Sequence, residues 1–279
     1  MRTLVVGFDS AWTAHKSGAV AAVEVHDHGV SVVSAPVTFS FVQATETIRA
    51  WSSSFDEVVV MIDQPTIVPN ATGCRPVEKI VSSPVSRAQG GVQPANQGRG
   101  DMFGPGAPVW AFLRAVGASL DPAGVSPRRV IETYPVLALL GLGWHDERGH
   151  LPKYNPERKT YRPAAWVALC LRLRDAFTVR GLPELATWCD KAQAAASGRA
   201  RSHHKAEQDK VDALICLLVG LRWLMGDPTI QIGTVHSGLM VVPSGMGLTR
   251  DLASRLTRLG WPAAEWLHDL TCRPAGSVT

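Results

Sequence analysis

The sequence predicts an α/β protein with a mixed five-stranded sheet flanked by helices. Apolar runs of strand length occur in residues 4–8, 57–62 and 128–132, and strands that are buried on both faces have this composition. Segments with helical character separate the runs, as expected for parallel strands joined by crossover helices. A chain of 279 residues, 46% of them hydrophobic and 19% charged, is long enough to bury one large core.

The first three strands are expected to be consecutive and antiparallel. GAVAAVEV (18–25) and GVSVVSAPV (29–37) flank the turn-like HDHG, which predicts a hairpin paired onto the first strand. QATETIRAWSS (43–53) has helical character and leads to EVVVMI (57–62), which a proline soon follows. Strand one is therefore expected at the centre of the sheet, with strands four and five added in parallel beside it.

A long loop is expected to follow strand four. Residues 64–108 are rich in Gly, Pro, Asn and Gln and too poor in apolar residues for a core of their own. Loops of this length inside a compact domain are usually functional or disordered. We therefore expect this segment to determine substrate specificity, with a helix over 109–118 after it.

The second half of the chain is predicted to be mostly helical. The expected helices cover 161–179, 183–196 and 205–225, followed by a hairpin over 230–242 and an amphipathic helix over 248–260. We expect one domain over residues 1–245 and a helical extension over 246–279 that packs on the same domain.

Composition limits the cellular setting. The five cysteines are scattered and form no CxxC pair, which argues against a zinc ribbon or a disulfide framework and favours the cytoplasm. The longest apolar segment, residues 211–225, is interrupted by Asp212 and Arg222 and is shorter than the about 20 residues needed to span a bilayer. The formal net charge of +4 permits a polyanionic substrate without requiring one.

Acidic side chains end all three apolar runs. Asp9, Asp63 and Glu132 follow strands one, four and five, and ligands gather at the carboxyl ends of such strands. Asp209 and Asp212 are spaced i,i+3, so they share one face of the predicted helix. Clustered carboxylates repel one another unless a cation compensates them. Mg²⁺ prefers oxygen ligands, and two such ions can clamp a phosphodiester, so we expect Asp9 to hold metal.

The motifs GFDSAW, IDQP, VIETYP and QDKVDAL resemble those of the domain-of-unknown-function 429 family, described as predicted nucleases with a ribonuclease H-like fold. The resemblance covers roughly residues 4–243. It implies a set of five catalytic acids, Asp9, Asp63, Glu132, Asp209 and Asp212. It also implies Mg²⁺ or Mn²⁺ as cofactor, held by all of these acids except Glu132. Two positions depart from the pattern: the family's glutamate-histidine-proline is here Glu-Thr-Tyr-Pro, and the related junction resolvases have Glu in place of Asp63.

Several basic residues are candidates for binding substrate phosphates. Arg75 and Arg87 lie in the expected long loop, and Lys159 and Arg162 lie in the basic segment LPKYNPERKTYR (151–162), which runs into the helix over 161–179. Side chains of this type contact nucleic-acid backbones. A solvated surface is the alternative interpretation of each one.

The leading functional hypothesis is a metal-dependent nuclease that acts on nucleic acid by activating water. The first alternative is an actin-like or sugar-kinase-like ATP-dependent phosphotransferase. Such proteins need glycine-rich phosphate turns after the early acids, whereas Ser-Ala-Trp and Gln-Pro follow the acids here. The second alternative is a nucleic-acid-binding module without turnover. Membrane partners are not expected, and a homodimer is expected if a branched duplex is the substrate.

Overall fold

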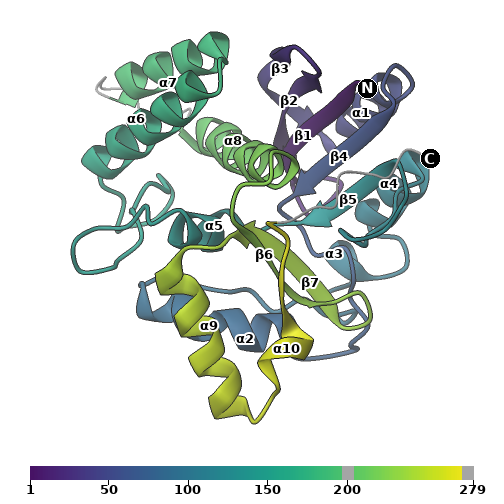
Figure 1. Cartoon of the computed structure of the whole chain (residues 1–279), viewed down its shortest axis with the longest axis vertical. Helices are drawn as coiled ribbons and strands as arrows, with labels where there is room; N and C mark the ends of the chain where they lie inside the picture. The colour runs from purple at the N-terminus through teal and green to yellow at the C-terminus, as the bar shows by residue number, and fades with distance from the viewer. Residues whose placement is uncertain (197–203, 272–279) are drawn as a thin grey trace.

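A five-stranded mixed sheet forms the centre of the protein (Figure 1). The computed structural model describes residues 1–196 and 204–271. The strands of the sheet are β1 (Thr3–Asp9), β2 (Ser17–His26), β3 (Gly29–Ser40), β4 (Glu57–Ile62) and β5 (Arg128–Glu132). Their order is β3-β2-β1-β4-β5, with β2 antiparallel to β1 and β3, and with β4 parallel to β1 and β5. The predicted mixed sheet with a central first strand is therefore confirmed.

Helices cover both faces of this sheet. The five helices involved are α1 (Phe41–Ser52), α4 (Pro108–Val116), α6 (Pro163–Val179), α7 (Pro183–Ala196) and α8 (His204–Leu224). Helices α1 and α4 cover one face, and α8 covers the other, with α6 packed against α8 and α7 against the edge strand β3 (Figure 1). Side chains of β1 alternate accordingly, since Leu4, Val6 and Phe8 join the α1 and α4 layer whereas Val5 joins the α8 layer. This alternation follows from the period of two in a strand.

Helix α8 touches the main chain of β1 directly at Gly7. A Cβ atom on Gly7 would lie 2.1 Å from the carbonyl oxygen of Ala213 and 2.4 Å from the backbone nitrogen of Leu217. Only a residue without a side chain permits this approach. Because Asp9 is two residues after Gly7 and Asp212 is adjacent to Ala213, the contact brings the carboxyl end of β1 close to the acids of α8.

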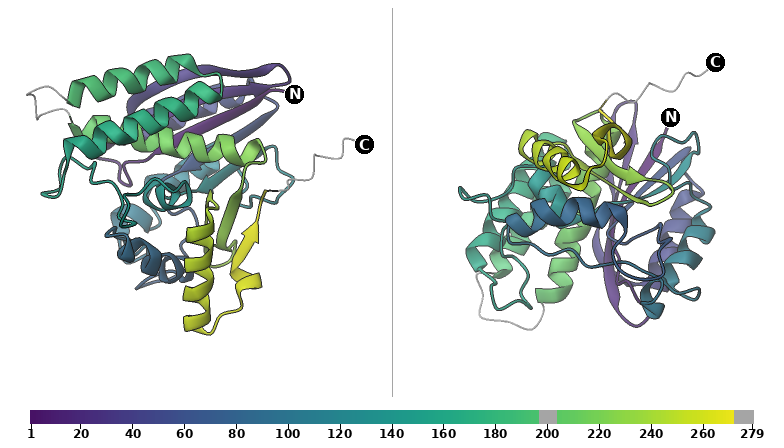
Figure 2. Two further views of the ribbon diagram at one scale, coloured as in Figure 1. Left: turned by 60° about the vertical axis from the view of Figure 1, so that its left-hand side comes forward. Right: turned by 90° about the horizontal axis from the view of Figure 1, so that it is seen from below.

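A smaller three-stranded sheet lies beside the main one (Figure 2). Its order is β7-β6-β8, with bounds β6 (Thr229–Thr234), β7 (Gly238–Pro243) and β8 (Leu267–Asp269). The helices around it are α2 (Pro76–Arg87), α5 (Pro135–Gly141), α9 (Met246–Leu259) and α10 (Ala263–Trp266). The predicted hairpin and closing helix are present, whereas β8, α10 and α5 were not predicted.

The long insertion expected over residues 64–108 follows β4, but it is not a loop throughout. This segment contains α2 and the short helix α3 (Gly100–Phe103). Proline at the first turn starts α2, and Val77, Ile80, Val81 and Val85 are buried in the main core. Within the described residues no helix is both long and apolar enough to cross a membrane.

Candidate active site

A cavity of about 1000 Å³ opens where β1, β4 and β5 end. All five acids singled out from the sequence line it, namely Asp9, Asp63, Glu132, Asp209 and Asp212. Asp9 is the last residue of β1, Asp63 directly follows β4, and Glu132 ends β5. The two remaining acids come from the first half of α8. The parallel strands and the α8 contact therefore bring together residues that are far apart in the sequence.

The ends of β1 and β4 are joined by polar contacts. The Nε1 atom of Trp12 donates a hydrogen bond of 2.7 Å to the carbonyl oxygen of Asp63, and the hydroxyl of Ser10 donates to Oε1 of Gln64. Trp12 has a φ of 60° and its ring meets the ring of Phe103 edge-on at 5.6 Å. These contacts fix the main chain on which Asp9 and Asp63 are carried.

The carboxylates of Asp9 and Asp63 have no hydrogen-bond donor among the residues that the structure describes. Asp9 is only 7% exposed and Asp63 is half-buried. Burial raises the pKa of Asp9 well above its usual value, and repulsion from Asp212 and Asp63 raises it further. Burial likewise raises the pKa of Asp63, with added repulsion from Asp212 and Glu132. The pair is a concentration of negative charge with little compensation.

Asp212 has two donors. The hydroxyl of Tyr154 donates to its Oδ1 at 2.6 Å and the Nε2 atom of Gln208 donates to its Oδ2 at 2.8 Å. Burial raises the pKa of Asp212 to about 6, although both hydrogen bonds act in the opposite direction. Its two oxygens are therefore held in a fixed orientation that faces the cavity.

Lys205 supplies positive charge beside these acids. Its ammonium group forms an ion pair with Asp209, one helical turn further along α8. Burial acts to lower the pKa of Lys205, but the hydrogen bond to Asp209 and the charges of Asp9 and Asp212 raise it overall. Lys205 was not among the residues predicted from the sequence, although its i,i+4 spacing from Asp209 is a pattern that favours such a pair. No sequence pattern pointed to Tyr154 or Gln208.

A buried arginine binds both carboxylate oxygens of Glu132. In this Glu132 differs from Asp9 and Asp63, whose oxygens have no donor among the described residues. Nη1 and Nη2 of Arg75 donate to its two carboxylate oxygens at 2.8 and 2.7 Å, and the amide of Thr66 donates at 3.3 Å. Burial raises the pKa of Glu132, and Arg75 opposes this rise. We therefore interpret Glu132 as a residue that positions the chain around the site.

Arg75 is wholly buried, which corrects its expected role as a phosphate-binding residue. Its side chain is 0% exposed. Besides Glu132 it contacts Glu78, through an Nε to Oε1 hydrogen bond of 2.8 Å, and the carbonyl oxygen of Ile67 at 3.0 Å. Glu78 also accepts hydrogen bonds from the amide of Ala95. A guanidinium group with all of these partners is not available to a substrate.

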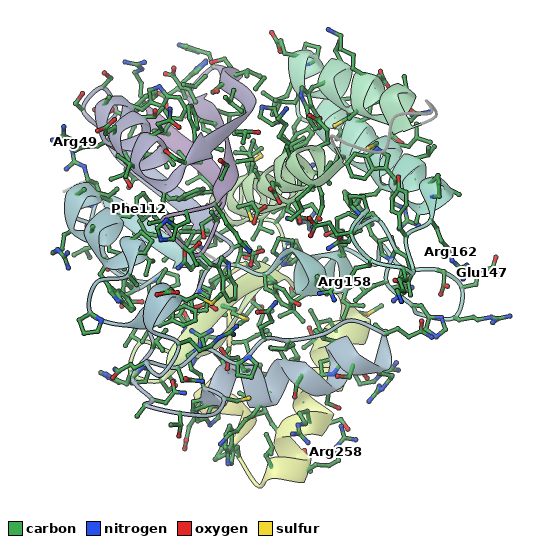
Figure 3. The ribbon with its side chains drawn as sticks, turned by 180° about the vertical axis from the view of Figure 1, so that it is seen from behind. Arg49, Phe112, Glu147, Arg158, Arg162 and Arg258 are labelled. Carbon is green, nitrogen blue, oxygen red and sulfur yellow. The ribbon has the colours of Figure 1, made fainter. Side chains whose placement is uncertain are left out.

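The other predicted phosphate-binding residues lie outside the large cavity. Arg87 forms an ion pair of 2.7 Å with Asp251, and Lys159 lines neither of the two cavities. Arg162 lines a second, smaller cavity, and Figure 3 shows it on the same side of the molecule as Arg158. The cations that line the large cavity, besides the buried Arg75, are Lys16, Lys153, Arg158 and Lys205.

No group of three or more His, Cys, Asp or Glu side chains is arranged to hold a metal ion in the part of the chain that the structure describes. Three of the five acids have a partner: Asp209 forms an ion pair, Asp212 accepts from two donors, and Glu132 is paired with an arginine. Asp9 and Asp63 are the two whose oxygens have no such partner.

Removing the Tyr154 hydroxyl should destabilise the protein in a pH-dependent way. We expect Tyr154→Phe to lower the free energy of unfolding at pH 8 by about 1.5–3 kcal/mol, since hydrogen bonds to charged groups contribute that much. The loss should shrink at pH 5, where Asp212, with a pKa of about 6, is mostly protonated. Urea unfolding at both pH values measures this, and an equal loss at both would contradict the assignment of the bond to a charged Asp212.

Comparison with models of protein families matches residues 7–234 to one family, whose description is "Protein of unknown function (DUF429)". No curated protein and no solved structure matches the chain. The matched range contains all five acids and most of the cavity lining.

Proposed function

The chain belongs to the DUF429 family of proteins of unknown function, and from its site we propose that it is a metal-dependent nuclease that hydrolyses phosphodiester bonds of nucleic acid. The observation that carries this proposal is the pair Asp9 and Asp63, two desolvated carboxylates without donors that border a large cavity. Desolvated charge without a partner is costly to a fold and is commonly retained for function.

The chemical type of the donors suits Mg²⁺ or Mn²⁺, although side chains would have to move before three or more of them could surround one ion. All four proposed ligands, Asp9, Asp63, Asp209 and Asp212, are carboxylates, the ligand type that such hard cations prefer. Repulsion among these carboxylates raises the pKa values of Asp9 and Asp63, and a bound cation would reverse that effect. Asp9 and Asp63 would bind through their unoccupied oxygens. Asp209 would join them by giving up its ion pair with Lys205. Asp212 would join them through the lone pairs that its two hydrogen bonds leave free.

The residues around the acids have separate roles in this proposal. A bound metal ion would supply an activated water and stabilise charge on the phosphate. Tyr154 and Gln208 orient Asp212, while Lys205 keeps positive charge beside the acids. Lys153 and Arg158, which line the same cavity, attract the phosphate backbone.

The ribonuclease H-like fold suggested by the sequence motifs is part of the same proposal. It is supported by the central β1 with Asp9 at its end, by the parallel strands β4 and β5 that follow it in the sheet, and by acids on the late helix α8. The cytoplasmic location is supported by Cys74, Cys170, Cys189 and Cys216, which are free thiols. The homodimer stays a prediction.

Hydrolysis of a small chromogenic diester tests the proposal without assuming a nucleic-acid shape. We expect wild-type protein to hydrolyse bis(p-nitrophenyl) phosphate and labelled oligonucleotides with Mg²⁺ or Mn²⁺, and to lose this activity in EDTA. Asp212→Asn should be inactive on both substrates. The exposed Asp101→Asn on α3, which makes the same chemical change outside the cavity, should retain wild-type activity.

Two results would overturn the proposal. If neither substrate is cleaved with either metal, a phosphotransferase or a binding module without turnover becomes the better explanation. If Asp212→Asn cleaves as fast as wild type, any activity that is seen comes from elsewhere.

A further inference from the structure

A second cavity of about 260 Å³ adjoins the acidic one. The two cavities share part of their lining, including Gln89, Leu151 and Lys153. The far wall of the smaller cavity comes from Arg162, the N-cap residue of α6, and from Leu169 and Arg172 of the helix itself. A bound polymer that extends from the acidic cavity past Lys153 therefore enters a space lined by α6.

The smaller cavity is rich in positive charge. Neither Arg162 nor Arg172 forms an ion pair or a side-chain hydrogen bond within the described residues. The ammonium group of Lys153 donates to the carbonyl oxygen of Gln89 at 2.7 Å, and its pKa is lowered by burial and by the charge of Arg162. Three cations thus face this space without a carboxylate partner.

The acid that lines this cavity, Asp146, makes its contacts with groups other than these arginines. Its Oδ1 accepts the amides of Arg148 and His150 at 2.9 and 2.8 Å, and its Oδ2 lies 3.6 Å from Nδ1 of His150. These contacts close a turn, and no ion pair joins Asp146 to Arg162 or Arg172 within the described residues. The cavity is thus lined by Lys153, Arg162 and Arg172 against this one carboxylate. The lining therefore suits an anion, and a guanidinium pair suits a phosphate in particular.

The acids of the large cavity are recessed. Asp9 and Asp212 are 7% and 6% exposed, so a scissile phosphate must descend into the cavity to reach them. Duplex DNA is stiff over about 150 base pairs and does not bend into a recess of this size. A single strand can bend sharply and present one phosphate at a time.

We propose that the substrate is single-stranded nucleic acid, with the scissile phosphate in the acidic cavity and a neighbouring phosphate between Arg162 and Arg172. This inference rests on the proposed nuclease function and adds to it a substrate class and a second phosphate subsite. Lys153, in the shared wall, lies between the two phosphates.

Binding of labelled 12-nucleotide DNA and RNA strands tests the subsite. The measurement is fluorescence anisotropy over a salt series, in an Asp9→Asn background that prevents cleavage. We expect Arg162→Gln/Arg172→Gln to weaken binding of the preferred strand by about tenfold for each arginine, the size of a lost charged hydrogen bond. The slope of log affinity against log salt should fall by about 0.7, the value for one single-strand phosphate that is no longer neutralised.

Arg49→Gln/Arg114→Gln is the matched control. Both arginines are exposed and lie on α1 and α4, and Figure 3 shows the side bearing Arg49 and Phe112 of α4 opposite to Arg162. This control should keep wild-type affinity and slope. Equal affinity and slope in the Arg162→Gln/Arg172→Gln protein would overturn the subsite. Binding of a 12-base-pair duplex as tightly as the strand would overturn the single-strand assignment.

Bis(p-nitrophenyl) phosphate separates this inference from the proposed function. The small diester does not reach the second cavity, so Arg162→Gln/Arg172→Gln with Asp9 intact should hydrolyse it at the wild-type rate. If wild-type protein leaves the diester intact with either metal, the nuclease proposal fails, and strand binding still decides whether the second cavity holds phosphate.

Discussion

Asp9→Asn should abolish hydrolysis and at the same time stabilise the metal-free protein. Loss of a proposed metal ligand at the end of β1 is expected to lower kcat by on the order of 10³, equivalent to about 4 kcal/mol of barrier. When a chelator has removed the metal, the same substitution removes a buried carboxyl group whose pKa is raised by burial and by its acidic neighbours. We expect the free energy of unfolding to rise by on the order of 1 kcal/mol.

The stabilising effect has a defined pH dependence. The folded-state pKa values of Asp9, Asp63 and Asp212 are all raised, that of Asp212 to about 6. Between the unfolded and folded values the folded state binds more protons, so the free energy of unfolding falls as pH increases. Metal-free wild type should therefore be more stable at pH 5 than at pH 8. Asp9→Asn should show a smaller difference.

Thermal unfolding with EDTA or Mg²⁺ at both pH values checks these expectations. Mg²⁺ should stabilise wild type at pH 8 through preferential binding to the folded state, and it should stabilise Asp9→Asn much less. Asp101→Asn again serves as the exposed control. A lower melting temperature of Asp9→Asn in EDTA at pH 8 would contradict the view that Asp9 is an uncompensated charge.

The second large effect is expected at Arg75, far from solvent. Arg75→Met should lower the free energy of unfolding by about 3–5 kcal/mol, because it leaves Glu78 and Glu132 buried without their counterion. In a chain of this size the melting temperature should fall by roughly 10 °C. Activity should fall as well, since the guanidinium group that joins Glu132 to the carbonyl oxygen of Ile67, four residues after Asp63, is lost.

A double variant separates charge from packing at this position. Arg75→Met/Glu132→Gln removes one of the unpaired carboxylates, so it should be more stable than Arg75→Met alone, although less stable than wild type. Denaturant unfolding of the wild type, both single variants and the double variant completes the cycle. Strictly additive losses would mean that the electrostatic explanation is wrong.

The sheet and most helices were predictable because their signals are local. The runs that form β1, β4 and β5 are continuous and apolar, and α7 covers the predicted residues 183–196. Helix α2 escaped prediction because Pro84 and several serines interrupt its apolar positions. Its stability comes from burial against the core, which no local pattern reports.

The membership of the acidic cluster was predictable, but its internal contacts were not. Strand ends and helical spacing predict that the acids converge. One of the two donors to Asp212 is Tyr154, 58 residues earlier, and the partner of Glu132 is Arg75, 57 residues earlier. Pairings over such distances depend on how the connecting segments fold. The sequence therefore indicated Arg75 as a candidate for binding substrate and gave no reason to select Tyr154.

The contact between Gly7 and α8 has a consequence for evolution and for engineering. Main-chain atoms set the approach of β1 to Ala213 and Leu217, so drift among the surrounding core side chains should leave the separation of Asp9 from Asp212 almost unchanged. The two positions therefore offer a rigid frame for redesign. Histidines installed there would test whether the same backbone accepts a zinc-selective centre.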